Sequence, residues 1–443
     1  MSEYDGPGDH RVGPVEGKIG WRSWEVYDGW AMLLISALSM TIGYGVLSSF
    51  GVLYLDILKE FGASRARTAG IIAANSILYG ISTPLVGQVQ DRWGPRKVLV
   101  SGALLVALAT FAAGFVRSLW HLYLLYSLLS FGIAALGFVP NTALLSRLFP
   151  LGRGRAMGLA FAGGTIGASC MVPLTGYLAS TFGWRMAYQT IGGLILILVP
   201  LIAFSLRKKP HMRDFLLDRG VIRKALILDK RWASQTWTFS CAARTHQFWS
   251  IAAGHLFLGL FMSILRVHQV AHIVGKGYGE LLAASIFALS GILRAPGSLI
   301  GGLICDRLGR EADIMVSAGL IISSILSLLA VTDISRIWML YLFALLFGLG
   351  GGVGTPGQGA SIADLFEGKG LGSILGFLEM PAGIGGGIGA WLAGYLFDRT
   401  GSYETAFILA IFAIPFYCMG YWFAAPRKIR RRRRGASMRS PGP

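Results

Sequence analysis

The sequence predicts an all-α membrane protein of about twelve transmembrane helices, divided into two pseudo-symmetric six-helix bundles. Hydrophobic residues make up 54% of the 443-residue chain and charged residues only 14%, and the mean hydropathy is +0.59. The apolar residues fall in long runs, such as Trp30 to Tyr54 and Val98 to Val116. In lipid, every backbone polar group must be paired within its own segment, so these runs are predicted to be spanning helices.

The predicted helices follow the apolar runs in chain order. We expect them near residues 30–55, 68–90, 97–117, 120–146, 156–181, 186–206, 248–274, 281–304, 313–331, 336–362, 371–397 and 404–424. They divide the chain into an N-terminal tail (1–28), an N-terminal bundle (29–206), a basic linker (207–247), a C-terminal bundle (248–424) and a polybasic tail (425–443). The two tails and the linker are expected to be cytoplasmic.

The basic residues are distributed unevenly between the two sides of the membrane. With the N-terminus inside, the cytoplasmic segments hold about 30 of the 40 Lys and Arg residues, and the outer loops hold about eight. This asymmetry accounts for the net charge of +18 without a nucleic acid as partner. It predicts a multi-pass protein of the plasma membrane (the inner membrane of a bacterial cell) with both termini in the cytoplasm. The cluster from Arg427 to Arg434 is expected to bind anionic lipid headgroups.

Several other classes of protein are not expected. The first 28 residues lack the short apolar core of a cleaved signal peptide. The four cysteines have no paired spacing, so neither disulfides nor a metal site is predicted. The sequence contains no nucleophile–base pair, phosphate-binding loop or other cofactor motif, so neither enzymatic activity nor a cofactor is expected.

The two halves of the sequence repeat one another. The pattern Gly-x-x-x-Asp-Arg-x-Gly closes the second predicted helix at residues 87–94 and the eighth at residues 302–309, about 215 residues later. Pro140 has a counterpart in Pro356 at a similar separation. Two similar bundles can enclose a cavity at their interface and rock about it, as alternating-access transporters do.

Residues 87–97, Gly-Gln-Val-Gln-Asp-Arg-Trp-Gly-Pro-Arg-Lys, resemble the signature that the major facilitator superfamily carries between its second and third helices. The resemblance implies the major facilitator fold and a conformational latch that holds the two bundles together in one state. The latch residues that it implies are Gly87, Asp91, Arg92, Gly94 and Arg96, with Asp306 and Arg307 from the second copy. The alternative is that this basic cluster only fixes the topology.

A finer resemblance covers almost the whole membrane region and is to the monocarboxylate-transporter-like and oxalate/formate-antiporter-like branch. It rests on Asp28-Gly-Trp30 before the first helix, on Arg153-Gly-Arg-Ala-Met-Gly158 at the start of the fifth and on Gly394-Tyr-Leu-Phe-Asp-Arg-Thr-Gly401 in the eleventh. The resemblance implies transport of a small organic anion. These stretches mark the branch and do not identify the substrate.

Ionisable residues deep in the membrane are costly, so the few that occur mark candidate sites. Arg294, about ten residues from the inner end of the eighth helix, resembles the arginine that binds substrate carboxylate in monocarboxylate transporters. Its guanidinium could form a bidentate hydrogen bond with a carboxylate. The sequence departs from that family in having Ser290 where an acid is expected, and Ser48 or Ser49 near the place of a first-helix lysine. The alternative is a structural arginine.

Glu379 reaches a similar depth in the eleventh helix, about eight residues from its inner end. We hypothesise that it neutralises Arg294 in the empty carrier and takes up a proton when a substrate carboxylate displaces it. Proton binding and anion binding would then favour each other, which is symport. A static structural salt bridge is the alternative.

Other polar residues are candidates for the wall of the cavity. Those expected to line its N-terminal side are Tyr44, Asn75, Tyr79 and Asn141. The alternative is that they bond neighbouring helices.

Three basic side chains lie late in the seventh predicted helix, near the outer interface: Arg266, His268 and His272. The two histidines share one helix face and could bind a metal or shuttle protons, or the group could attract anions to a vestibule. Ordinary interfacial polarity is the default interpretation, and no metal site is assigned.

These observations predict a secondary active transporter that moves a small organic anion, a monocarboxylate by class, with a proton as the candidate co-substrate. Anion exchange and efflux of amphipathic compounds are alternatives within transport. A transporter-like nutrient sensor is the alternative from another class of function.

Overall fold

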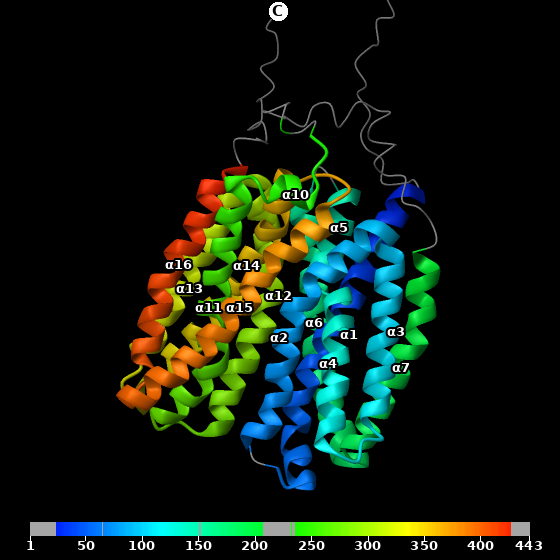
Figure 1. Ribbon diagram of the computed structural model, residues 1–443. Coiled ribbons are helices and arrows are strands. Elements are labelled where there is room, and N and C mark those ends of the chain that lie inside the picture. The colour runs from blue at the N-terminus through cyan, green and yellow to red at the C-terminus, as the bar shows by residue number, and fades with distance from the viewer. Residues whose placement is uncertain (1–23, 64, 150–151, 207–231, 233–234, 427–443) are drawn as a thin grey trace, which may run out of the picture.

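The computed structural model describes residues 24–63, 65–149, 152–206, 232 and 235–426. These residues contain 12 helical spans that are long and apolar enough to cross a membrane (Figure 1). The prediction of an all-α membrane protein with two bundles of spanning helices is therefore confirmed. Most of the two predicted tails and of the linker lies outside the described residues.

The N-terminal bundle forms the right-hand half of Figure 1. Its helices are α1 (Trp24–Phe61), α2 (Arg65–Trp93), α3 (Pro95–Ala113), α4 (Leu119–Leu136), α5 (Phe138–Leu148), α6 (Arg153–Phe182) and α7 (Trp184–Ser205). Helices α4 and α5 form one span, interrupted at Gly137, whose ψ of −147° is not helical.

The C-terminal bundle forms the left-hand half of Figure 1. A short helix, α10 (Phe239–Ala242), precedes it. Its further helices are α11 (His246–Gly275), α12 (Glu280–Arg307), α13 (Arg310–Leu329), the 3-10 turn η2 (Ile334–Arg336), α14 (Ile337–Leu365), α15 (Leu371–Thr400) and α16 (Glu404–Ala424).

The last glycine of each repeated motif allows a sharp reversal of the chain. Gly94 precedes α3 with a φ of 83°, and Gly309 precedes α13 with a φ of 111°. A residue with a Cβ rarely adopts these backbone angles, whereas glycine does so readily. Each reversal joins two antiparallel helices within one bundle.

The first glycine of each motif lies where the two bundles touch. Between the bundles, α2 packs against α15 and α6 packs against α12. A Cβ at Gly87 would overlap the carbonyl oxygen of Gly372, and a Cβ at Gly302 would lie 2.6 Å from the carbonyl oxygen of Gly154. Both glycines therefore permit a close approach of helices that a larger residue would prevent.

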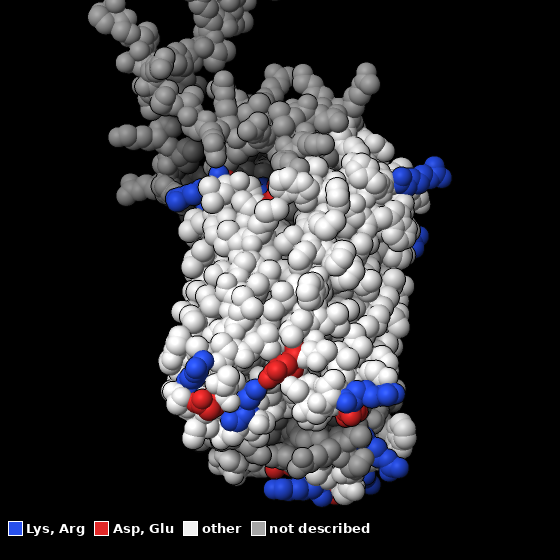
Figure 2. Space-filling model, turned by 90° about the vertical axis from the view of Figure 1, so that its left-hand side faces the viewer, with Lys and Arg blue, Asp and Glu red and all other residues white. Residues whose placement is uncertain are grey.

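Both described chain ends lie on the same side of the molecule, at the top of Figure 1. We call this side, where α1 begins and α16 ends, the terminal end, and the other side the far end. Figure 2 shows one lateral face, on which Lys, Arg, Asp and Glu gather toward the two ends and leave an uncharged band between them. Large apolar side chains such as Trp338, Phe412 and Phe416 are exposed on the outside of the C-terminal bundle, as expected for contact with lipid.

Candidate functional site

Asp91, at the terminal end of α2, caps the first turn of α15 in the opposite bundle. Its carboxylate accepts hydrogen bonds from the backbone N–H groups of Gly372 (2.9 Å) and Ser373 (2.7 Å), and from the Ser373 hydroxyl (2.6 Å). The first N–H groups of a helix lack partners within it and carry partial positive charge, so a carboxylate is stabilised there. Arg147 lies 3.7 Å from Asp91 and donates a hydrogen bond to the carbonyl of Gly368 (3.4 Å).

Asp306, the corresponding residue at the end of α12, makes the same kind of contact in the other direction. Its carboxylate accepts hydrogen bonds from the backbone N–H groups of Gly154 and Arg155, each 3.1 Å long, at the start of α6. The Arg155 side chain adds a third bond of 3.1 Å through Nε. Each copy of the repeated motif thus caps a helix of the opposite bundle.

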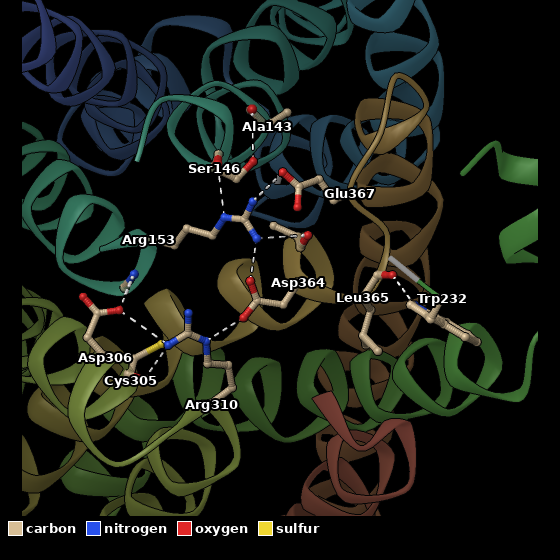
Figure 3. A network of polar contacts seen from close by, with 12 residues as sticks. Ala143, Ser146, Arg153, Trp232, Cys305, Asp306, Arg310, Asp364, Leu365 and Glu367 are labelled. Carbon is tan, nitrogen blue, oxygen red and sulfur yellow. Dashed lines mark hydrogen bonds and ion pairs between the residues drawn. The ribbon is translucent and has the colours of Figure 1, made fainter. Parts of the chain in front are cut away.

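A buried ion network surrounds the second cap (Figure 3). The guanidinium of Arg153 is only 1% exposed and lies 2.5 Å from Asp364, 3.1 Å from Glu367 and 3.1 Å from the carbonyl of Ser146. Arg310 donates to the other oxygen of Asp364 over 2.9 Å. Asp364 therefore lies between two guanidinium groups, one from each bundle. This network was not predicted from the sequence.

The other residues of the predicted latch have different surroundings. Arg92, Arg96 and Arg307 are exposed, and no ion pair joins them to another described residue. Gly94 forms the turn into α3. Among the residues of the two repeated motifs, the aspartates and the first glycines contact the opposite bundle, whereas the three arginines are exposed.

These contacts seal the terminal end of the interface. The deepest bond among those described here is donated by the Thr83 hydroxyl of α2 to the Gly376 carbonyl of α15, over 3.1 Å. Two tryptophans that precede α10 also bind the end of α14 and the loop that follows it. There the Trp232 indole donates to the Leu365 carbonyl (2.6 Å), and the Gly370 N–H donates to the Trp237 carbonyl (3.3 Å).

Two tyrosines meet near the break between α4 and α5. The hydroxyls of Tyr44 (α1) and Tyr79 (α2) approach the same residue, Gly137. They lie 3.5 and 3.4 Å from the position that a Cβ would occupy at Gly137. The absence of a side chain at Gly137 thus leaves room for the tyrosine pair, which can offer a hydroxyl donor to a ligand.

The charges of two arginines of the C-terminal bundle act on the Tyr44 hydroxyl of this pair. Arg294, near the middle of α12, is half-buried and donates a hydrogen bond to the Gly351 carbonyl of α14 over 3.4 Å. Arg266, in α11, is exposed, and its charge acts on both Arg294 and the Tyr44 hydroxyl. No carboxylate of the described residues forms an ion pair with either arginine. Arg266, expected near the outer interface, therefore belongs to the central group.

Glu379 does not pair with Arg294 in this conformation, contrary to the hypothesis drawn from the sequence. Its Oε2 lies 3.5 Å from Nδ1 of His255 in α11, and its charge acts on Tyr44 with the sign opposite to that of the two arginines. The reason is the order of the helices: α15 packs against α11 and α2, whereas α12 packs against α14 and α6. Equal depth along two helices does not place their side chains on facing sides.

The chain matches a known family over most of its length. Residues 30–322 and 295–441 match the profile of the Major Facilitator Superfamily. The chain belongs to this superfamily.

The facilitator has relatives among the monocarboxylate transporters. It is 31% identical to monocarboxylate transporter 13 of Rattus norvegicus, over 90% of the chain and 88% of that relative. It is 28% identical to monocarboxylate transporter 11 of Mus musculus (90% and 86% covered) and 26% identical to monocarboxylate transporter 4 of Rattus norvegicus (89% and 82% covered). The facilitator is thus a monocarboxylate-transporter-like membrane protein, and it is a transporter rather than an enzyme.

Two of the polar residues expected in the wall of the facilitator's cavity are engaged in helix packing. The Asn75 amide donates to the Tyr126 carbonyl (2.7 Å) and is 1% exposed. The Asn141 amide donates to the Leu136 carbonyl (2.8 Å), while its oxygen accepts a bond from the Ser39 hydroxyl (3.1 Å). For both residues these contacts agree with the alternative, that they bond neighbouring helices. Neither residue is therefore part of the proposed site.

The two late histidines of α11 also contact protein groups. A ring nitrogen of His268 lies 3.0 Å from the Ala390 carbonyl of α15. His272 is 4% exposed and packs edge-on against Phe407. Neither histidine faces a carboxylate at ion-pair distance within the described residues.

Proposed function

We propose that this facilitator carries a small organic anion, a monocarboxylate by class, by alternating access between its two bundles. The observation that supports this best is Arg294, a guanidinium in the middle of a spanning helix without a described carboxylate partner. A charge at this depth costs free energy unless it is paired or has a function. A substrate carboxylate would supply the missing partner through a bidentate hydrogen bond.

In this proposal the substrate is bound by both bundles. Arg294 holds the carboxylate from the C-terminal side, and the Tyr44–Tyr79 pair donates a hydroxyl from the N-terminal side. Arg266 raises the local positive potential and draws the anion in. A ligand that contacts both bundles favours the conformations in which they approach each other, which ties substrate binding to closure.

Glu379 is the proposed proton site. Its side chain is 22% exposed and its charge acts on the tyrosine pair. It can therefore exchange a proton with water in the substrate space, the region between Arg294 and the tyrosine pair where we propose that the anion binds. Protonation removes a negative charge close to where the anion binds, so each ligand favours the other. Glu379 and Arg294 are not paired, so the anion does not have to displace Glu379 from Arg294. Protonation and anion binding are instead coupled by the electrostatic interaction between Glu379 and the bound anion.

We further propose that the terminal end faces the cytoplasm of a cell whose plasma membrane holds the protein. The basic loops at this end support that orientation. The cluster from Arg427 to Arg434, outside the described residues, would then bind anionic lipid headgroups. The structure then corresponds to a carrier closed toward the cytoplasm.

Ligand-dependent thermal stabilisation of the detergent-purified protein tests the substrate class. We expect stabilisation by a subset of small monocarboxylates, and at least a 30-fold weaker response in Arg294→Gln, since a hydrogen bond to a charged group contributes about 2 kcal/mol. Arg336→Gln, an exposed arginine at the far end, is the matched control. Stabilisation that survives Arg294→Gln undiminished would refute the site.

Uptake into proteoliposomes tests the mode of transport with the carboxylate that stabilises the protein best. We expect an inside-alkaline pH gradient to drive accumulation, and Glu379→Gln to abolish the response to the gradient while exchange continues at equal pH. If unlabelled substrate inside accelerates uptake and a pH gradient does not, the carrier is an exchanger and the proton role of Glu379 is wrong.

A further inference from the structure

A buried histidine to which the proposed transport cycle assigns no role lies next to Glu379. His255, in α11, is completely buried, and its Nδ1 is 3.5 Å from Oε2 of Glu379. Its Nε2 is 2.7 Å from the hydroxyl of Tyr421 in α16. Burying an imidazole this deeply in a membrane-spanning bundle is unfavourable unless its polar atoms have partners.

The two ring nitrogens face different kinds of partner. Nδ1 faces the Glu379 carboxylate, which only accepts when it is ionised, so the hydrogen of the neutral ring belongs on Nδ1. Nε2 faces a hydroxyl, which can donate or accept. A second proton can therefore enter at Nε2 when the Tyr421 hydroxyl rotates from donor to acceptor, without any movement of heavy atoms.

The groups around Glu379 offer no other base at this distance within the described residues. The remaining titratable groups on which its charge acts are tyrosine hydroxyls, from α1, α2 and α16: Tyr44, Tyr79 and Tyr421. From the other elements packed on α15, Arg147 of α5 is bound to the preceding loop, and Phe239 of α10 stacks on Phe377. The charges of Arg294 and Arg266 act on Tyr44 with the sign opposite to that of Glu379.

We propose that His255 and Glu379 form a proton-binding dyad, in which Glu379 meets the substrate space and His255, fixed by Tyr421, positions the carboxylate and shares its proton. The inference rests on the proposed function and adds a residue to it. One bound proton raises the net charge of the dyad by one, whichever residue carries it, so an anion in the central space favours the protonated dyad.

Nuclear magnetic resonance of the full-length protein, labelled with ¹⁵N-histidine in nanodiscs, tests the dyad without any substrate. We expect the signal of His255 to titrate between pH 4 and 9, and Glu379→Gln to move its midpoint to lower pH by about one unit, because the imidazolium loses its carboxylate. His268, on the same helix but bonded to a backbone carbonyl, is the matched control and should not shift. His255→Gln assigns the signal, and if that variant does not fold, single replacement of each of the other six of the seven histidines assigns it by elimination.

Two results would overturn the dyad: a His255 midpoint that Glu379→Gln leaves in place, and a His255 that stays neutral over the whole range in both proteins. Transport separates this failure from that of the proposed function. Loss of proton-driven uptake in Glu379→Gln together with a wild-type pH profile of uptake in His255→Gln would refute the dyad and leave the proposed function intact. If the dyad is right, His255→Gln shifts the midpoint of that profile to higher pH by about one unit, whereas His268→Gln does not.

Discussion

The two copies of the repeated motif use the same contact in different surroundings. Asp91 and Asp306 both bind the backbone N–H groups that begin a helix of the opposite bundle. The side chain of Asp91 is 12% exposed, and that of its neighbour Arg147 is 37% exposed. The side chain of Asp306 is 3% exposed and adjoins the buried network of Arg310 and Asp364.

This difference shows that the repeat determines where the seal is made, and that residues outside it determine its strength. A charge pair in contact with water contributes little, because solvent screens it. A buried ionic group that loses its partner is strongly destabilised. The α6–α12 side of the seal should therefore resist opening more than the α2–α15 side.

Cys305 can report on this seal. Its thiol is completely buried and lies 2.9 Å from the position that a Cβ would occupy at Gly154. In a protein whose other three cysteines, Cys170, Cys241 and Cys418, are replaced by serine, the rate of maleimide labelling measures how often α6 and α12 separate.

The largest effect is expected from Arg153→Met, which removes a buried guanidinium partner from both Asp364 and Glu367. Breaking a buried ion pair costs about 3–5 kcal/mol. We expect labelling of Cys305 to accelerate more than 100-fold and the apparent melting temperature to fall. Labelling at the wild-type rate would show that the network does not hold the bundles together.

A smaller effect is expected from Asp306→Asn. The variant keeps an acceptor for the α6 amides but loses the charge that faces Arg155 and Arg310. Hydrogen bonds to charged groups contribute about 1.5–3 kcal/mol, which corresponds to a 10- to 100-fold acceleration of Cys305 labelling. The double variant with Arg153→Met should show less than the sum of the two effects, because both residues belong to one network.

Asp91→Asn is the matched comparison in the first copy. We expect a cost of about 1 kcal/mol, the size of a charge–helix interaction near solvent, and thus about a fivefold acceleration in the same assay. If Asp91→Asn opens the seal as much as Asp306→Asn does, the proposed inequality of the two copies is wrong.

The smallest effect is expected at the far end. Glu60 pairs with Arg185 within the N-terminal bundle, beyond the α1 span, and a hydrogen bond from Arg185 holds the pKa of the Glu60 carboxyl below its usual value of 4.5. The pair therefore stabilises the fold above that pH, and this contribution is lost as the pH falls through the folded-state value. After solvent screening we expect Glu60→Gln to lower stability at pH 7 by only about 0.5 kcal/mol, with unchanged Cys305 labelling.

Much of the fold could be predicted because it depends on local properties of the chain. Long apolar runs indicate spanning helices, and the repeated motif indicated Gly87, Asp91 and Asp306 as residues of the interface. Other partners depend on the order and rotation of the helices, which depth along the chain does not give. The pairing of Arg153 with Asp364, 211 residues away, and that of Glu379 with His255 both arise in this way.

Capping between the bundles also affects which sequence changes the carrier can tolerate during evolution. The donors at the starts of α6 and α15 are mostly backbone amides, which every residue except proline retains. Residue identity is restricted at two of these positions, because a Cβ at Gly154 or Gly372 would lie 2.9 or 2.8 Å from an oxygen of the aspartate that it faces. Inserting or deleting one residue there would rotate the helix by about 100° and turn the amides away, so the seal depends on chain length at these two helix starts as well as on the two glycines.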